Sequence, residues 1–133
     1  MKKLVLLGAA VVGSFVFAGT AQAATWNTIG STSDRSTYST WAWITKSDVR
    51  ASAPLRTIVR APRGRTEISG YVFCWSPSTY DYSSRNFSWA YRSNGRTQLW
   101  KHSIPTLGYS RCDVSLDYEG QGGYLTAKLQ RYA

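Results

Sequence analysis

Apolar residues after position 23 recur in short runs with the two-residue period of β-strands, and no stretch keeps the spacing of an amphipathic helix. The runs are rich in Trp, Tyr, Val, Ile and Thr, and clusters of Gly, Pro, Ser and Asn separate them. This spacing predicts an all-β fold: a small single-domain antiparallel β-sandwich of about seven strands, immunoglobulin-like or a similar Greek key. A small barrel is the alternative. Strands are predicted at residues 40–46, 55–61, 66–76, 86–93, 96–102, 109–118 and 123–132.

The first 23 residues have the composition of a secretory signal peptide. Lys2 and Lys3 precede an apolar run at 4–18, and residues 21–23 give the small-x-small pattern that signal peptidase reads. The run is shorter than the roughly 20 residues of a membrane span, which makes an uncleaved anchor the weaker alternative. We therefore expect a secreted, extracellular protein, and a leader of this kind is typical of bacteria. The expected organisation is a signal peptide at 1–23, a polar N-terminal arm at 24–39 and a β-sandwich domain at 40–133; the arm is either loose or a short edge strand.

Cys74 and Cys112 are the two cysteines of the chain. An even number of cysteines in an oxidising compartment predicts one disulfide. Closing a loop of this length stabilises a fold by about 4 kcal/mol on the chain-entropy account. Zinc is the alternative, but His102 is the only histidine and the spacing matches no zinc signature. No metal site is expected.

The order Cys74, Trp89 and Cys112, followed by a Gly-rich final hairpin, resembles that of immunoglobulin-like sandwiches. Tyr109 stands three residues before Cys112, where that family has a tyrosine two residues before its second cysteine. The resemblance covers the C-terminal half of the chain and implies a sandwich, not membership of the family.

Two hairpins are predicted from local patterns. Asn94-Gly95 suits a tight two-residue turn, which would pair Trp89 with Trp100 on a ribbon with one aromatic face. That face would consist of Phe87, Trp89, Tyr91, Trp100 and His102. The Gly-rich segment 120–123 is predicted to join the last two strands as an antiparallel pair. Side chains of this pair that should face the core are Cys112, Val114, Leu116, Tyr118, Leu125, Ala127 and Leu129. Those that should face solvent are Lys128, Gln130 and Tyr132.

Basic residues outnumber acidic ones after the leader. The chain has 16 Lys and Arg and 7 Asp and Glu, so without Lys2 and Lys3 the net charge is +7. Such a surface attracts polyanions and is sensitive to salt. The segment 55–65 concentrates arginines, which we expect to form a continuous anion-binding strip or, alternatively, a solvated strand face. These arginines are Arg56, Arg60, Arg63 and Arg65.

Aromatic residues are more abundant than a sandwich of this size readily hides, with six Trp and nine Tyr. Around Cys74 the strand is apolar on both sides, so either it is covered twice or Tyr71, Phe73 and Trp75 form an exposed ladder. Tyr80 and Tyr82 lie in a Ser-rich loop. Exposed rings of this kind suit stacking on sugars or placement at a membrane interface. The predicted ligand-binding aromatics are Tyr71, Trp75, Tyr80 and Tyr82.

Residues for catalysis are poorly represented. His102 falls in a predicted strand beside Lys101, and no nucleophile elbow is present, which favours a structural role in the aromatic face. Asp113 and Asp117 share a strand face, and their neighbourhood favours a solvated strand over a glycosidase pair. We therefore expect no enzymatic activity and no cofactor.

These observations favour a secreted, non-enzymatic binding module for polyanionic or glycan-rich extracellular surfaces such as cell-wall polymer. One alternative is a cationic, Trp-rich effector that acts on a competitor's membrane or envelope. A second is a proteinase inhibitor that presents the loop 76–85. The expected partner is a polyanion or glycan surface, with a membrane surface as the second candidate; no nucleic acid partner is expected, and the protein should be a monomer.

Overall fold

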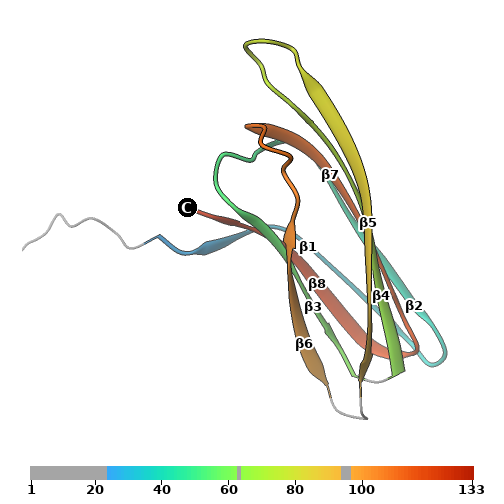
Figure 1. The fold of residues 1–133 in the computed structure, drawn as a ribbon. Helices are drawn as coiled ribbons and strands as arrows, with labels where there is room; N and C mark the ends of the chain where they lie inside the picture. Colours follow the sequence, from blue (N-terminus) through green and yellow to red (C-terminus); the bar gives the residue numbers. More distant parts are fainter. Residues whose placement is uncertain (1–23, 63, 94–96) are drawn as a thin grey trace, which may run out of the picture.

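A computed structural model of the protein describes residues 24–62, 64–93 and 97–133. These ranges form eight β-strands in two four-stranded antiparallel sheets that pack face to face (Figure 1). The strands are β1 (Trp26–Ser36), β2 (Thr40–Arg50), β3 (Leu55–Ala61), β4 (Gly64–Trp75), β5 (Tyr82–Ser93), β6 (Gln98–Ile104), β7 (Arg111–Gly120) and β8 (Gly123–Tyr132). The expected signal peptide, Arg63 and the Asn94-Gly95 turn lie outside the described residues. No helix in the described ranges is long and apolar enough to cross a membrane.

The predicted β-sandwich is confirmed, and each predicted strand is present. The largest differences are at the end of β2, which extends to Arg50, and the start of β5, which begins at Tyr82. An additional strand, β1, lies within the segment expected to be an arm, so the edge-strand alternative is the one observed. Although β1 is polar, it is held in place because it pairs with β8 over almost its whole length, from Trp26 to Ser36.

The strand order is that of one long hairpin rolled into a sandwich. β1 pairs with β8, β2 with β7, β3 with β6, and β4 with β5, so the chain doubles back once, at the loop between β4 and β5. Successive pairs of this ribbon alternate between the sheets, whose orders are β1-β8-β3-β6 and β2-β7-β4-β5. This is the jelly-roll arrangement of two Greek keys. The prediction allowed either an immunoglobulin-like sandwich or a similar Greek key. The observed strand order is that of the second, not of an immunoglobulin domain.

Both hairpins predicted from local patterns are wrong for the same reason. β5 and β6 belong to different sheets, and so do β7 and β8. In a rolled ribbon, most strands that follow one another in the chain face each other across the core instead of pairing by hydrogen bonds. Among the described strands only β4 and β5 are both consecutive and paired.

The core-facing pattern of the last two strands is nevertheless confirmed, because alternation depends on which side is buried and not on which strand is the partner. All seven residues expected in the core are buried. Gln130, expected in solvent, is only 9% exposed. Its amide is satisfied on the sheet surface: Oε1 accepts from Arg56 Nε at 2.8 Å, and Nε2 donates to Thr28 Oγ1 at 3.2 Å.

Tyr118 is the one large aromatic residue that is fully buried among the described residues. Its hydroxyl hydrogen-bonds to Thr57 of the opposite sheet, and Thr57 in turn donates to the backbone oxygen of Lys128 at 2.9 Å. Since the single Thr57 proton goes to that oxygen, Tyr118 is the donor in the bond between the two hydroxyls. Burial raises the pKa of Tyr118 well above its usual value, so the hydroxyl stays protonated.

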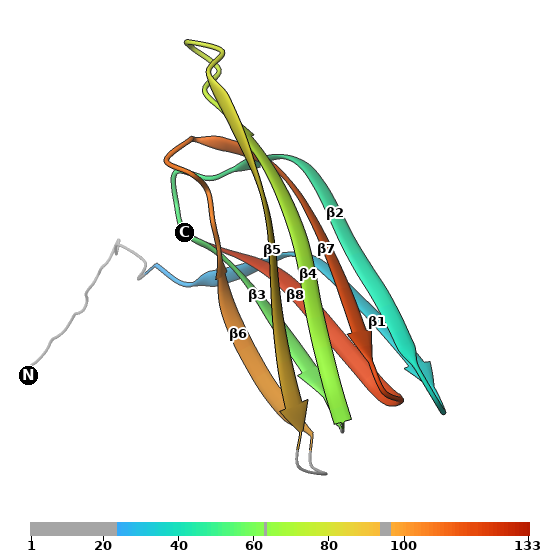
Figure 2. The same cartoon turned by 45° about the vertical axis from the view of Figure 1, so that its right-hand side comes forward.

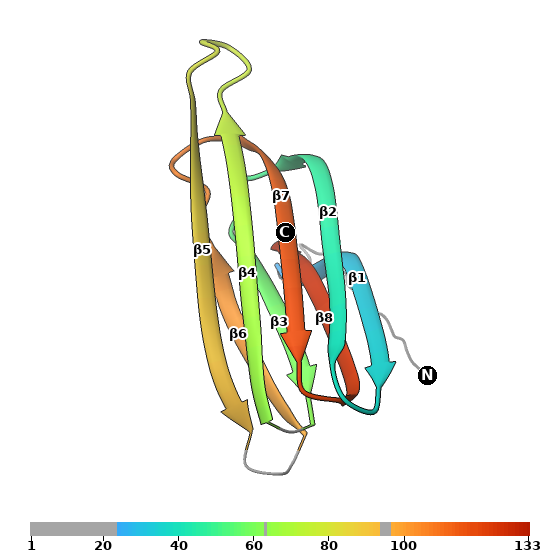
Figure 3. The same ribbon diagram turned by 90° about the vertical axis from the view of Figure 1, so that its right-hand side faces the viewer.

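The two open sides of the sandwich are closed differently. At the β1–β2 side the sheets approach closely: a Cβ on Gly30 would lie 2.9 Å from Ile44 Cγ2. Figure 3 shows β5 and β6 at the other side of the sandwich. Half-buried rings lie between the sheets there, and we call them the aromatic wedge. The wedge consists of Phe87, Trp89, Tyr91, Trp100 and His102.

The wedge contains the residues predicted to share an aromatic face, but they meet across the core instead of along a ribbon. Trp89 stacks on His102 with ring centroids 4.1 Å apart, and Tyr91 stacks on Trp100 at 4.8 Å. Phe87 lies over Gly70, where a Cβ would come within 2.1 Å of its ring. His102 is therefore a structural member of the wedge, as predicted.

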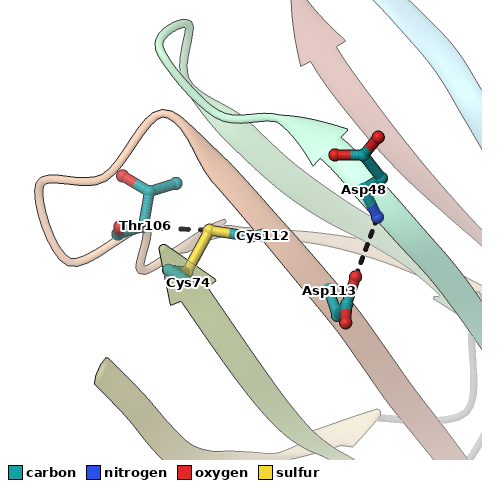
Figure 4. Close-up of a disulfide and its surroundings, with 5 residues drawn as sticks. All are labelled: Asp48, Cys74, Thr106, Cys112 and Asp113. Carbon is teal, nitrogen blue, oxygen red and sulfur yellow. Dashed lines mark hydrogen bonds between the residues drawn. A yellow bond between two sulfur atoms is a disulfide. The ribbon is translucent and has the colours of Figure 1, made fainter. Parts of the chain in front are cut away.

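The predicted disulfide is present between Cys74 and Cys112 (Figure 4). The two residues are direct partners in the β4–β7 register, with Cα atoms 4.0 Å apart. The bond thus joins neighbouring strands of one sheet, whereas the corresponding bond of immunoglobulin domains joins two sheets. Both cysteines are fully buried, and the backbone oxygen of Thr106 lies 3.9 Å from Cys112 Sγ.

Candidate functional site

The outer face of the β2-β7-β4-β5 sheet carries an aromatic ladder on β4. Val72 and Cys74 point into the core, so Tyr71, Phe73 and Trp75 point outward by the alternation of a strand. Tyr71 is 41% exposed, and Phe73 and Trp75 are half-buried. The ladder is therefore the alternative that the structure shows.

Tyr82 of β5 extends this ladder sideways. It pairs with Trp75 in the register, and its ring stacks on Phe73 with centroids 5.4 Å apart and an interplanar angle of 23°. Phe73 and Trp75 are themselves 6.0 Å apart. Three rings from two strands thus form one continuous surface. Tyr82 is the most exposed of the three, at 68%.

The loop between β4 and β5 adds a fourth ring. This loop projects beyond the ends of the neighbouring strands (Figure 2). It is closed by two backbone bonds of 2.9 Å, from Ser76 N to the Asp81 oxygen and from Tyr80 N to the Ser76 oxygen. Tyr80 has a φ of 61°, in the left-handed region that favours glycine, and it is 81% exposed.

The four rings, Phe73, Trp75, Tyr80 and Tyr82, form the aromatic platform. Together with Asp113 they line a shallow cavity of about 360 Å³. Asp113 pairs with Phe73 in the register, and its Oδ1 accepts a hydrogen bond of 2.8 Å from the backbone nitrogen of Asp48 (Figure 4). The cavity therefore combines apolar ring surfaces with a positioned carboxylate acceptor.

The disulfide lies directly behind the platform. Cys74 stands between Phe73 and Trp75 in the chain, and Cys112 stands between Arg111 and Asp113. Since the disulfide faces the core and these neighbours face outward, it fixes β4 against β7 at the height of the cavity. Arg111 adds an ion pair with Asp48, with Nη1 and Oδ1 2.9 Å apart.

A second aromatic pair occupies the same face on the edge strand β2. Trp41 and Trp43 have ring centroids 5.2 Å apart and are 59% and 57% exposed. Strand β7 separates this pair from the platform, and its outward residues include Ser115 and Asp117. Hydrogen-bonding groups therefore lie between two exposed aromatic surfaces.

The continuous arginine strip predicted from segment 55–65 is not formed. Arg56 and Arg60 lie on the outer face of β3, whereas Arg65 lies on the outer face of β4 in the opposite sheet. Arg65 is bound there to Glu67, with Nη2 and Oε2 2.8 Å apart. Arg63 lies outside the described residues. The strip is not formed because β3 and β4 belong to different sheets.

The predicted aromatic residues are brought together more closely. Trp75, Tyr80 and Tyr82 line one cavity, and Tyr71 continues the same face along β4. The sequence pattern placed Phe73 in the possible ladder, but Phe73 was not among the predicted ligand-binding aromatics. Asp113 was missed as a member of the site, because its role depends on a strand pairing that no local pattern reveals.

No group of three or more His, Cys, Asp or Glu side chains in the described ranges could hold a metal ion. Burial lowers the pKa of His102, which is stacked within the wedge and away from the platform.

No protein family matches the sequence, and no curated protein matches it either. Among solved structures, the chain is similar to the carbohydrate-binding module TmCBM61 in complex with β-1,4-galactotriose: 13% identity over 86% of this chain and 74% of that one, with a TM-score of 0.35. It is also similar to a structure on promiscuous specificity in carbohydrate-binding modules of the β-sandwich superfamily, at 12% identity over 86% of this chain and 57% of that one, with a TM-score of 0.36.

Proposed function

We propose that this chain is a non-catalytic binding module that attaches to a glycan at an extracellular surface through the aromatic platform. The observation that carries the proposal is the exposed, pre-formed group of rings around a carboxylate acceptor. A sugar ring has apolar C–H faces and a polar edge of hydroxyl groups. Aromatic faces suit the former, and Asp113 suits the latter.

The platform is arranged before any ligand arrives. Phe73, Trp75 and Tyr82 are on paired strands, and the disulfide holds β4 against β7 behind them. Groups that are already ordered lose little side-chain freedom on binding, which favours affinity. Arg111, which faces outward from β7 at this end of the sheet, is paired with Asp48, so its charge is already balanced.

The backbone of Tyr80 supports a role for its ring. A tyrosine at a φ of 61° lies in the left-handed region, which costs a residue with a Cβ about 1 kcal/mol. The ring is 81% exposed, so packing in the fold does not offset that cost. Contact with a ligand would.

The test is a Trp fluorescence titration with a panel of neutral oligosaccharides. Tyr80→Ala combined with Tyr82→Ala should weaken binding at least fivefold, because it removes half of the platform. The melting temperature should stay within about 2 °C, since changes at exposed side chains are usually within ±0.5 kcal/mol.

The matched control is Tyr124→Ala combined with Tyr132→Ala, two exposed tyrosines on the opposite sheet. This pair should leave oligosaccharide affinity unchanged. Equal losses from both pairs would contradict the platform as the binding site. Liposome leakage that is lost with the platform rings would instead favour the membrane effector.

A further inference from the structure

The outer face of the β1-β8-β3-β6 sheet is basic. Its outward residues follow from the register, because Leu55, Thr57, Val59, Leu125, Ala127 and Leu129 occupy the inward positions. Among the outward-facing positions of these four strands there is no Asp or Glu. Asp34 of β1, the one acid in these strands, is at an inward position, because it pairs with the core residue Leu125; it accepts a hydrogen bond from Trp41 N at 2.8 Å. The cations on this face are Arg35, Arg56, Arg60, Lys101 and Lys128.

Four of these cations surround one apolar side chain. Ile58 of β3 pairs with Lys101 of β6 on one side and with Lys128 of β8 on the other. Strand spacing places the two lysine backbones about 10 Å apart. Arg56 and Arg60 lie before and after Ile58 on the same strand face, about 13 Å apart by strand rise. We call this group the cation diamond: Arg56, Arg60, Lys101 and Lys128.

Arg56 is fixed in place by two contacts. Its guanidinium lies over the Trp26 ring, 4.1 Å from the centroid, and its Nε donates to Gln130. The Nε–H is one of five donors on an arginine, so the terminal nitrogens keep four more for a ligand. A guanidinium ordered in this way can hold a carboxylate or sulfate through two parallel hydrogen bonds.

A shallow cavity of about 430 Å³ adjoins Ile58 and is lined by two of the four diamond residues. Ile58 and Leu99 supply apolar surface, Thr126 and Gln130 supply hydroxyl and amide groups, and Arg60 and Lys128 supply charge. A second cavity, of about 340 Å³, extends from Lys128 and Thr126 toward β1 and Tyr124. The two cavities share Thr126, Ala127 and Lys128, so they form one track across the strands.

We propose that this face binds a linear acidic polysaccharide, with carboxylate or sulfate groups on the cation diamond and sugar rings along the shared track. The lack of acids gives charge complementarity to a polyanion. Bases of single-stranded nucleic acid stack on free ring faces, whereas one face of Trp26 and one face of Tyr124 are already occupied by Arg56 and Arg35. The site is separate from the aromatic platform and does not depend on the proposed function.

The experiment compares two triple variants that lower the net charge equally. Arg60→Gln, Lys101→Gln and Lys128→Gln alter exposed positions of the diamond and leave the structural contacts of Arg56 intact. Arg50→Gln, Arg85→Gln and Arg92→Gln alter exposed positions on β2 and β5 of the other sheet. Each protein is titrated with heparin and with polygalacturonate at several salt concentrations.

The diamond variant should bind heparin at least tenfold more weakly and show a shallower salt dependence, while the control variant should stay within about threefold of the original. Unchanged melting temperatures would confirm that all three proteins are folded. Equal losses in both variants, or no heparin binding by the unaltered protein, would overturn the proposal. Tighter binding of single-stranded DNA than of either polysaccharide would overturn the choice of ligand.

Neutral oligosaccharide binding by the platform should be the same in all three proteins. A protein that binds heparin but no neutral sugar would keep this inference and refute the proposed function. A protein that binds neutral sugar but no heparin would keep the proposed function and refute this inference.

Discussion

The aromatic wedge and the aromatic platform contain the same residue types in different surroundings. Rings in the wedge have partners from both sheets: Trp89 of β5 stacks on His102 of β6, and Tyr91 of β5 on Trp100 of β6. Rings in the platform rest on one sheet and on each other, and Tyr80 and Tyr82 are mostly exposed. The wedge therefore serves stability, and the platform is available for a ligand.

Strand β5 supplies rings to both groups. On β5, Tyr82 faces outward, while Phe87, Trp89 and Tyr91 face inward. The start of β5 also lies beside the projecting loop, whereas its second half lies over β6. Position along the strand and side of the sheet together decide whether a ring stabilises the fold or is left exposed.

The largest expected effect comes from the disulfide behind the platform. Replacing Cys74 and Cys112 by Ala should lower the free energy of unfolding by about 4 kcal/mol, because the unfolded chain regains the freedom of a 38-residue separation. The melting temperature should fall by about 15 °C. Alkylation of the unaltered protein should find no free thiol, and two alkylated cysteines would contradict the bond.

Trp89→Ala should have the next largest effect. Loss of the ring removes its stacking on His102 and its contact with Phe87 and leaves a cavity between the sheets. The free energy of unfolding should fall by about 3 kcal/mol, measured by urea titration.

Trp43→Ala is the matched control, because Trp43 is 57% exposed on an edge strand. It should cost about 0.5 kcal/mol or less. If Trp43→Ala destabilised the protein more than Trp89→Ala, the assignment of inner and outer rings would be inverted.

Alternation along single strands was readable from the sequence, and pairing between strands was not. The core faces of β7 and β8 were predicted correctly from Val114, Leu116, Leu125 and Leu129. Their partners were not, because the residue types at 94–95 and 120–123 favour a hairpin locally, whereas the strands that flank each of these segments lie in different sheets. Local turn chemistry says how tightly a chain reverses, not which sheet it enters.

The same limit applies to the candidate sites. Tyr71, Phe73 and Trp75 share a face through strand period alone, so the ladder was predictable. The cation diamond draws Lys101 and Lys128 from strands that are far from Arg56 and Arg60 in the chain. Sequence proximity instead suggested Arg65, which lies on the other sheet.

The titration of His102 gives a smaller effect on the wedge. Burial lowers its pKa below 6.5, so the unfolded state binds a proton more readily than the folded state. The stability contributed by neutral His102 is complete above pH 6.5 and is lost as the pH falls below that value. His102 is the only histidine, which isolates this effect between pH 7.5 and 5.5.

The measurement is the melting temperature of the unaltered protein and of His102→Phe over that range. Phenylalanine keeps a ring against Trp89 and cannot titrate. The unaltered protein should lose stability toward pH 5.5 relative to the variant, by less than the loss in Trp89→Ala. Parallel curves of melting temperature against pH would show that the pKa of His102 is the same in the folded and unfolded states.

Tyr80→Gly should have the smallest effect on stability and separates the two regions most sharply. Glycine adopts a φ of 61° without the strain that a Cβ brings, but it also gives the unfolded chain more freedom. The two contributions nearly cancel, so the melting temperature should stay within about 2 °C of the original. Glycan affinity should fall, because the most exposed ring of the platform is lost. If Tyr80→Gly lowered the melting temperature as Trp89→Ala does, Tyr80 would be part of the structural framework, and the division between wedge and platform would not hold at the loop.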